Sequence, residues 1–454
     1  MTTESHPTVS EQLAKHFLGV KVEAIDSKNI SGAKVLLLDY LGVALCGSTT
    51  ESGRIAAAMA AGMKGVAEAT MIGTVHRVPA TEAAFANAVA SHSLELDDVD
   101  KEALFHFGPP VVSAALAAGE TMGCSGKDLL TAIVCGCEMM ERVSWAANPT
   151  LRNRGFHTTA AAGVFGSTIA SGKLLGLNES QLVSALGLAG AQASGLMEMY
   201  GRSMQKRFNP GPAARNGVYA SRLARLGFTG AETIFEGERG YLQAFTGGPG
   251  NLDALRPDMK KPYPLEVEYK AYACARPIHP AIDAALSLRP KVLPRLSEIT
   301  KIEVFRHPMW AHYHTNKEPG SYHEAQVSLP YSVAVALIDG DAFLEQYEKA
   351  EPLDAEVRKL MEKVVIVPDD RLPTTVACRV KIFLPGTEPL VSQVDHPKGS
   401  IQNPMSTEER RNKFTKLAGR VLTKKEMQTL IEHVEQIETT NNVDSLIRLL
   451  RQER

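Results

Sequence analysis

One histidine in the first half of the chain is placed where it could transfer a proton. His157 lies in the stretch "RNRGFHTTAAAGVFG", residues 152–166, between an arginine pair and a run of small residues. At the expected start of a helix it would have free backbone N–H groups nearby, and the small residues after it would leave room for a ligand. A histidine hydrogen-bonded into a helical core fits the same residues, so this stretch alone leaves both interpretations open.

A second candidate segment is acidic. The stretch "SHSLELDDVDKEALFHFGPP", residues 91–110, carries Glu95, Asp97 and Asp98, followed by His106. Carboxylates beside a histidine favour its charged form and orient the ring, which suits general acid–base catalysis. A solvated acidic loop with a capping histidine is the alternative. The sequence has neither the glycine-centred spacing of a calcium loop nor a His-Glu-x-x-His motif, so we expect no metal.

Two further segments carry positive charge. "YGRSMQKRFNPGPAARNG" contains Lys206 and Arg207, and "YKAYACARPIHPAIDAAL" contains Lys270, Arg276 and His279. Facing inward, these side chains would bind carboxylates, whereas facing outward they would form ordinary solvated basic edges. The second segment falls at the expected junction between two domains, where ligand clefts are common. Together with the histidines, the basic residues predict a small polycarboxylate substrate.

Several classes of partner are excluded by composition. The net charge is -2 and like charges form no block, so the basic face that binds nucleic acids or membranes is missing. Neither a phosphate-binding loop nor a Gly-x-Gly-x-x-Gly turn after a strand is present, which argues against a nucleotide. The six cysteines lack disulfide or cluster spacing, the N-terminus lacks a signal-peptide core, and the apolar runs are interrupted before membrane-spanning length. We therefore expect a cytoplasmic protein without a nucleic-acid or membrane partner.

The elements that must position these residues are mostly helices. Residues 1–268 form one apolar, Ala- and Gly-rich helical pattern after another, with helix-start signals at Ser125-x-x-Asp128 and Asn178-x-x-Gln181. Small residues let such helices approach closely. We predict a large all-helical domain over this range.

The pattern changes in the last third of the chain. "ITKIEVFRH", "KVVIVPDD" and "TTVACRVKIFLPG" are predicted strands between helical stretches, the last with Val376, Cys378, Val380, Ile382 and Leu384 on one face. Residues 269–404 therefore predict a smaller α+β lid domain. Residues 405–454 return to helix, with capping boxes at Ser406 and Thr423, and are expected to pack on the first domain because two helices cannot bury their apolar faces alone. The predicted fold is mainly α, with the helical domain built from both termini.

With these segments assembled, the sequence resembles the MmgE/PrpD family. The resemblance covers nearly the whole chain, in order, and rests on the motifs "HSLELDDVDKEALFHFG", "GFHTTAAAGVFG", "KRFNPGPAARNGVYASRLARLGFTG", "FEGERGYLQAF", "YKAYACARPIHPAIDAA" and "AQVSLPYSVAVALIDG". It implies the two-domain fold predicted above, a homodimer, and no metal or organic cofactor. It also implies a set of catalytic residues that gather between the domains: Glu95, Asp97, His106, His157, Lys206, Lys270 and Tyr331. Expected substrate-binding helpers are Arg207, Arg276, Asp98 and His279.

Three positions depart from the pattern that many relatives share. Phe107 follows His106 where proline is common, Asn209 replaces a histidine, and Val99 or Asp100 stands where threonine or histidine is frequent. Because these positions surround the expected substrate, they bear on which acid is bound and which reaction follows.

The chemistry implied by the resemblance is proton movement at a carbon next to a carboxylate. We expect a hydro-lyase that dehydrates 2-methylcitrate or a citrate-like acid, with decarboxylation of a cis-aconitate type or epimerisation of an iminodisuccinate type as alternatives. The lysines would stabilise an enolate-like anion, and His106 or His157 would act as base or acid. Two alternatives of other classes are a non-catalytic carboxylate-binding protein and a helical scaffold, although a scaffold would be expected to show repeats or exposed apolar stripes.

Overall fold

The chain divides into two compact units. The computed structural model describes residues 6–100, 105–199, 203–256, 265–350 and 352–452. The larger unit comprises Met1–Ser93, Asp97–Val267 and Arg410–Arg454, and the smaller unit comprises Leu94–Leu96 and Glu268–Glu409. The boundaries expected from sequence were 268/269 and 404/405. A three-residue piece, Leu94–Leu96, thus belongs to the smaller unit although both of its flanking segments belong to the larger one.

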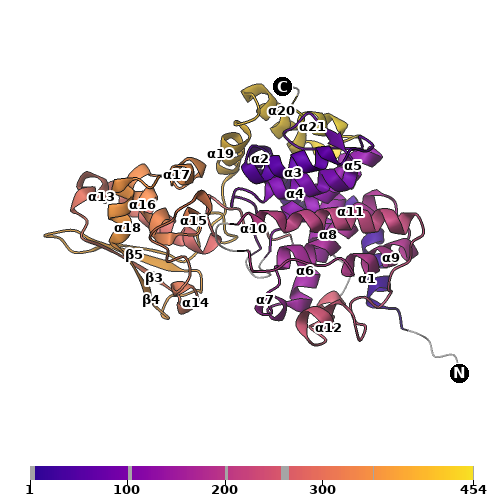
Figure 1. Cartoon of the computed structure of the whole chain (residues 1–454), viewed down its shortest axis with the longest axis horizontal. Coiled ribbons are helices and arrows are strands. Elements are labelled where there is room, and N and C mark those ends of the chain that lie inside the picture. The colour runs from indigo at the N-terminus through magenta and orange to yellow at the C-terminus, as the bar shows by residue number, and fades with distance from the viewer. Residues whose placement is uncertain (1–5, 101–104, 200–202, 257–264, 351, 453–454) are drawn as a thin grey trace. The chain divides into compact units, whose positions relative to one another are not determined.

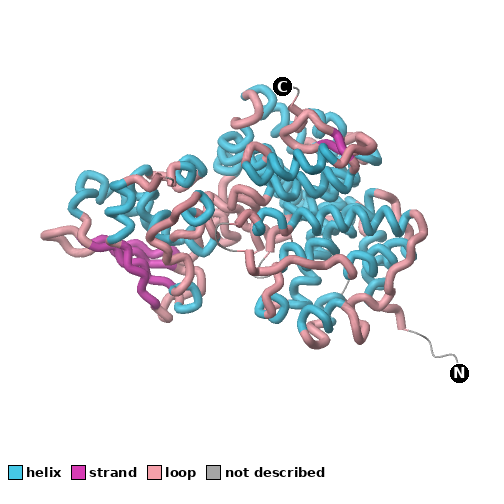
Figure 2. Tube along the Cα trace, viewed as in Figure 1, coloured by secondary structure: helices cyan, strands magenta, loops and turns pink. Residues whose placement is uncertain are grey.

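The larger unit is a set of packed helices (Figures 1 and 2). Its helices before the smaller unit are α1 (Val9–Gly19), α2 (Ser27–Gly47), α3 (Glu51–Gly62), α4 (Ala80–Ser91), α5 (Ser113–Met122), α6 (Gly126–Ala147), α7 (Thr150–Asn153), α8 (Thr158–Leu174), α9 (Glu179–Gly190), α10 (Gln205–Phe208), α11 (Pro210–Arg225) and α12 (Tyr241–Thr246). Helix α19 (Thr407–Ala418) leads back into it, followed by α20 (Lys424–Glu435) and α21 (Asp444–Arg448). The start signals predicted at Ser125 and Asn178 both cap helices, α6 and α9.

The central helix α8 packs against α6 and α11 through residues without side-chain bulk. A Cβ added at Gly166 would lie 2.7 Å from the carbonyl oxygen of Gly136, and one at Gly163 would lie 2.9 Å from Pro110. The space beside the small residues that follow His157 is therefore filled by neighbouring helices. Our expectation that they leave room for a ligand is wrong, because close helix packing uses that space.

Helix α2 corrects a second expectation. Among the residues that the structure describes, it alone has the length and hydropathy of a membrane-spanning helix. Its Leu36, Leu37 and Leu41 are fully buried within the larger unit. An interior helix needs the same apolar composition as a membrane span because both avoid water on most sides. The sequence does contain a run of this length, and in the fold it is a core helix.

The C-terminal helices pack on the N-terminal part of the chain, as predicted. The backbone N–H of Gly126, at the start of α6, donates to the carbonyl oxygen of Thr440. Similarly, Gly73 donates to Leu450, and the Arg451 guanidinium binds Glu120 at 2.8 Å. The larger unit is thus built from both ends of the chain. It also contains one short strand pair, β1 (Ala69–Thr70) and β2 (Arg77–Val78), which the all-helical prediction missed because two-residue strands have no periodic pattern.

The smaller unit holds a four-stranded sheet. Its strands are β3 (Lys301–Arg306), β4 (Val364–Pro368), β5 (Cys378–Phe383) and β6 (Leu390–Val394), in the order β4-β3-β5-β6. Strands β3 and β4 are parallel, and the other neighbours are antiparallel. Its helices are α13 (His279–Val292), α14 (Pro308–Ala311), α15 (Tyr322–Ala325), α16 (Leu329–Asp339), α17 (Leu344–Glu348) and α18 (Ala355–Glu362).

One face of this sheet is covered by helix α13, which contacts β5 and β6 and in turn packs on α16. In β5 the predicted inward residues Cys378, Val380 and Ile382 are buried, and Leu384 just beyond the strand is buried as well. Val376 lies before the strand and is only half-buried. The mainly α fold with a small sheet is confirmed.

The contact at Gly126 gives a test of how the two ends of the chain pack. A Cβ at this position would lie 1.8 Å from the carbonyl oxygen of Ile437. We expect Gly126→Ala to lower the free energy of unfolding by about 1–3 kcal/mol, because the C-terminal segment must shift. Gly62→Ala is the matched control, since Gly62 is exposed at the end of α3 with nothing within 4 Å of its would-be Cβ. Urea denaturation of both variants checks this, and equal stability would contradict the close packing.

Candidate active site

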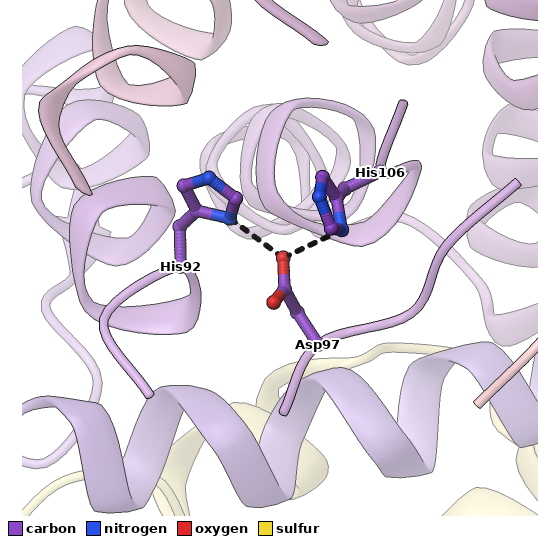
Figure 3. Close-up of side chains that lie close together, drawn as sticks. All are labelled: His92, Asp97 and His106. Carbon is purple, nitrogen blue, oxygen red and sulfur yellow. Dashed lines mark hydrogen bonds and ion pairs between the residues drawn. The ribbon is translucent and has the colours of Figure 1, made fainter. Parts of the chain in front are cut away.

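Two histidines share one carboxylate oxygen in the larger unit. His92 Nδ1 lies 2.6 Å and His106 Nδ1 lies 3.0 Å from the same atom, Asp97 Oδ2. Figure 3 shows Asp97 between the two rings, with both dashed lines meeting at that oxygen. His92 and Asp97 are each 1% exposed. A buried carboxylate needs such donors, because an ionised oxygen without partners is costly away from water.

Four segments of the chain supply the side chains of this cluster. His92 caps the C-terminus of α4, and Asp97 follows five residues later. His106 precedes the π-helical turn η2 (Gly108–Val112), and its backbone N–H donates to Thr159 Oγ1 in the first turn of α8. His157 is the N-cap residue of that helix. The His92 ring centroid lies 4.8 Å from that of His106 and 6.2 Å from that of His157.

The hydrogen bonds determine the tautomer of His106. Its Nδ1 makes a short contact with the backbone carbonyl oxygen of Asp98, which can only accept a hydrogen bond. Nδ1 must therefore carry a proton, and the negative charge of Asp97 lies 3.0 Å from the same nitrogen. In the neutral ring the lone pair is then on Nε2. His106 can accept a proton at Nε2.

His157 has the opposite tautomer. Its Nδ1 lies 3.1 Å from Asn209 Nδ2, and the same amide nitrogen lies 3.4 Å from the Leu196 carbonyl oxygen and 3.1 Å from Met199 Sδ. Because a carbonyl and a thioether only accept, the amide group facing them is the NH₂, and it donates to His157. His157 Nδ1 is therefore the acceptor, and its Nε2 carries the proton. His157 can donate a proton at Nε2.

Burial favours the neutral form of His92 and His157. His157 is 3% exposed, and burial, helped by the charges of His92, His106 and Lys206, holds its pKa well below the ordinary value. Burial also lowers the pKa of His92 from 6.5 to about 4, against the opposing pull of Asp97. Lys206, half-buried on α10, is close enough to lower the pKa of both His92 and His157. A fixed cation thus stands beside a proton acceptor and a proton donor.

Asp98, which we expected to help bind substrate, accepts two backbone hydrogen bonds in the structure. Its oxygens accept the backbone N–H groups of Phe107 at 2.6 Å and Gly108 at 2.9 Å. Burial, followed by the charge of Asp97, raises the pKa of Asp98 to about 7. The side-chain carboxyl group of Asp98 anchors the start of η2. Its backbone carbonyl oxygen accepts a hydrogen bond from the ring of His106.

Four more predicted residues lie in the smaller unit and form pairs there. Glu95 Oε2 binds Lys270 Nζ at 3.0 Å, with both side chains 2% exposed. Glu95 has a φ of 56°, the left-handed region, which is uncommon for a residue with a side chain. Arg276 binds Glu268 and His279 Nδ1. These contacts bring Glu95 and Lys270 together within the smaller unit.

Two predicted residues remain. The hydroxyl of Tyr331 donates to the Gln346 carbonyl oxygen within the smaller unit, at 2.5 Å. Arg207 is 5% exposed on α10, next to Lys206 in the larger unit. Tyr331 therefore has a structural partner, whereas Arg207 remains a candidate for binding substrate.

Sequence reasoning missed two residues of the cluster, His92 and Asn209. His92 stands at the start of the quoted acidic segment, five residues before Asp97, and Asn209 was noticed only as a departure from the family pattern. A histidine that precedes an acidic run by about one helical turn could have identified the first. Nothing in the local sequence connects Asn209 with His157, 52 residues earlier.

The cluster could also be considered as a metal site, because ligand atoms of His92, Asp97 and His106 lie within 4.8 Å of one another. A divalent cation would need deprotonated Nδ1 atoms on both rings. The contact of His106 Nδ1 with the Asp98 carbonyl opposes that. The geometry of these residues fits a hydrogen-bonded group better than a cation site.

Comparison with known proteins gives the family. A model described as the MmgE/PrpD N-terminal domain matches residues 11–252, and one described as the MmgE/PrpD C-terminal domain matches residues 272–439. The chain belongs to the MmgE/PrpD family, and the resemblance drawn from the motifs is confirmed. It is 29% identical to a cis-aconitate decarboxylase-like protein of Aspergillus oryzae, over 99% of this chain and 98% of that protein. It is 28% identical to human cis-aconitate decarboxylase and 27% identical to that of Aspergillus terreus, over 98% and 97% of this chain and 95% and 96% of the relatives.

The lowered pKa of His92 predicts an acid-sensitive fold. Between pH 6.5 and about 4 the unfolded chain binds a proton at this residue that the folded protein excludes, so stability falls as the pH falls. His92→Asn cannot take up that proton. The free energy of unfolding in urea should fall between pH 7 and pH 4.5 in both proteins, by about 2–3 kcal/mol less in this variant than in the wild type. His76→Asn, at an exposed position, is the control and should lose as much stability in acid as the wild type. The same loss in His92→Asn would contradict a buried neutral imidazole at position 92.

The hydrogen-bonded geometry also predicts that the cluster does not bind a transition metal. Titration with Co²⁺ at neutral pH should produce no visible absorption bands from a His-carboxylate complex, because both Nδ1 atoms carry protons. Saturable bands in the wild type that disappear in His92→Asn would overturn this assignment.

Proposed function

We propose that this protein is a lyase without a cofactor that acts on a small di- or tricarboxylic acid by moving a proton at a carbon next to a carboxylate. The observation that carries the proposal is the pair of opposite tautomers: His106 offers a lone pair at Nε2, and His157 offers a proton at Nε2. Lys206 supplies the positive charge that an anionic substrate and an enolate-like intermediate need. Family membership supports a lyase-type role.

Decarboxylation of an unsaturated tricarboxylic acid of the cis-aconitate type is the first candidate. It is favoured by the names of relatives that match this chain over nearly its whole length. In this reaction the C–C bond to the departing carboxylate breaks, and its electron pair forms a terminal C=C bond. The electrons of the original double bond take a proton at the far carbon, and His157 Nε2–H would provide it. Carbon dioxide leaves, and His157 regains its proton from water.

Dehydration of a citrate-like hydroxy acid is the second candidate, favoured by the lone pair of His106. Elimination of water needs a base that removes the proton next to the carboxylate and an acid that protonates the leaving hydroxyl group. His106 would take the first proton, and His157 would donate the second. Asp97 would stabilise the imidazolium that forms on His106, as a carboxylate does when it holds a catalytic histidine in one tautomer. Decarboxylation needs only the proton donor. A proton acceptor beside the donor therefore supports dehydration as the second candidate.

Incubation of the wild-type protein with a panel of di- and tricarboxylic acids in deuterated water, followed by NMR, separates these reactions. Decarboxylation gives terminal alkene signals, carbon dioxide and one deuterium at the far carbon. Dehydration gives an alkene with all carbons retained. Deuterium uptake without loss of any group indicates epimerisation. Binding of an acid without any of these changes would overturn the proposal and indicate a carboxylate-binding protein.

Two variants test the assigned roles. We expect His157→Ala and Lys206→Ala each to reduce turnover at least about a hundredfold, because one removes the proton donor and the other the fixed cation. His433→Ala, on helix α20, is the control and should retain wild-type turnover. Circular dichroism verifies that each variant is folded. Turnover near that of the wild type in either folded variant would contradict its role.

A further inference from the structure

His92 belongs to the cluster, but the proposed reaction gives it no proton to transfer. Its Nδ1 lies 2.6 Å from Asp97 Oδ2, a shorter contact than the 3.0 Å between that oxygen and His106 Nδ1. His106 Nδ1 donates its proton to the carbonyl oxygen of Asp98 and lies beside the Asp97 carboxylate without a hydrogen bond to it. The bond from His92 is therefore the one that fixes the position of the shared oxygen.

Burial keeps the ring of His92 neutral by lowering its pKa, helped by the charges of His106 and Lys206 and opposed by that of Asp97. Asp97 approaches from the loop after α4, His106 from the segment before η2, His157 from the start of α8, and the charge of Lys206 from α10. A proton added to His92 would place a second cation beside Lys206 in a buried site. Among the residues that the structure describes, His92 Nε2 has no hydrogen-bond partner. This geometry suits a permanent N–H donor at Nδ1 rather than an acid or base.

We infer that His92 is a positioning residue: its Nδ1–H holds the Asp97 carboxylate beside His106 Nδ1, where the negative charge adds to the Asp98 carbonyl in favouring the tautomer with a lone pair on Nε2. The effect on turnover rests on the proposed function, whereas the effect on the tautomer does not. A carboxylate that has lost the N–H donor on this oxygen can rotate toward other partners. His106 Nδ1 would keep the Asp98 carbonyl as its acceptor but lose the negative charge beside it, so its preference for the Nδ1–H tautomer would weaken and fewer molecules would offer the lone pair at Nε2.

Three substitutions separate this role from simple packing. The side-chain amide nitrogen of His92→Asn is attached to the same carbon position as the imidazole Nδ1, so this variant can still donate to Asp97. The amide nitrogen of His92→Gln stands one bond further out and is displaced from that oxygen. His92→Phe keeps a ring and removes the donor. The matched control is His16→Phe, which breaks another buried histidine–carboxylate contact, His16 Nε2 to Glu138 Oε1 at 2.9 Å, outside the cluster.

Long-range ¹H–¹⁵N NMR of histidine-labelled protein without substrate reads the tautomer directly, and His106→Gln assigns the signals. We expect His92→Phe and His92→Gln to move the two His106 nitrogen signals toward each other, as mixing of tautomers requires. His92→Asn and His16→Phe should leave them as in the wild type. In turnover of the acid identified above, His92→Phe should lower kcat about 10- to 100-fold. Its KM should change less than about threefold, because His92 does not contact substrate. His92→Asn should restore kcat to within about threefold of the wild type.

Two results would overturn the inference. A wild-type His106 spectrum in folded His92→Phe would show that His92 does not set the tautomer, whether or not any acid is consumed. A loss of kcat in His92→Asn equal to that in His92→Phe, with an unchanged His106 spectrum, would show that His92 acts in another way. If the spectra change as expected but no acid in the panel is consumed by the wild type, the proposed function alone is contradicted.

Discussion

The cluster depends on one buried carboxylate oxygen that lies against the Nδ1 atoms of two imidazoles. Asp97 is almost completely removed from water, so its charge must be stabilised by groups of the protein. The hydrogen bond from His92 holds this oxygen in place, and its negative charge favours a proton on Nδ1 of both rings. The requirement that stabilises the carboxylate therefore also prepares His106 to accept a proton. Stability and reactivity are set by the same contact.

A second hydrogen bond complements the first. Asn209 donates to His157 Nδ1 and leaves the proton on Nε2, the reverse of the arrangement at His106. Two imidazoles with opposite tautomers can act as proton acceptor and proton donor on the same substrate. The position of Asn209 is also a departure from the family pattern. An amide at this position can donate without becoming charged, which keeps the proton of His157 on Nε2.

The helices bring these residues together because the side chains at their contacts are small, which lets the helices approach closely. Gly211 in α11 lies where a Cβ would be 2.8 Å from Phe85 of α4, and Gly163 in α8 is packed by Pro110. Helix starts and caps were predictable because each depends on residues three or four positions apart. The strand β5 was predictable from alternation for the same reason. Strand β6 and the pair β1–β2 were not, since short strands are defined by their partners and not by their own sequence.

The sequence by itself determined the mainly α fold, the family, and the kinds of side chain available for proton transfer to a carboxylic acid. Only the tertiary structure decided how three nearby carboxylates are divided: Asp97 binds two histidines, Asp98 binds backbone N–H groups, and Glu95 binds Lys270. All three lie within four residues, so composition and spacing treat them alike. Their partners come from segments up to 175 residues away, and Glu95 belongs to the smaller unit whereas Asp97 belongs to the larger one. The packing of the chain decides which carboxylate binds which partner, because hydrogen bonds act over a few ångströms in space and not along the sequence.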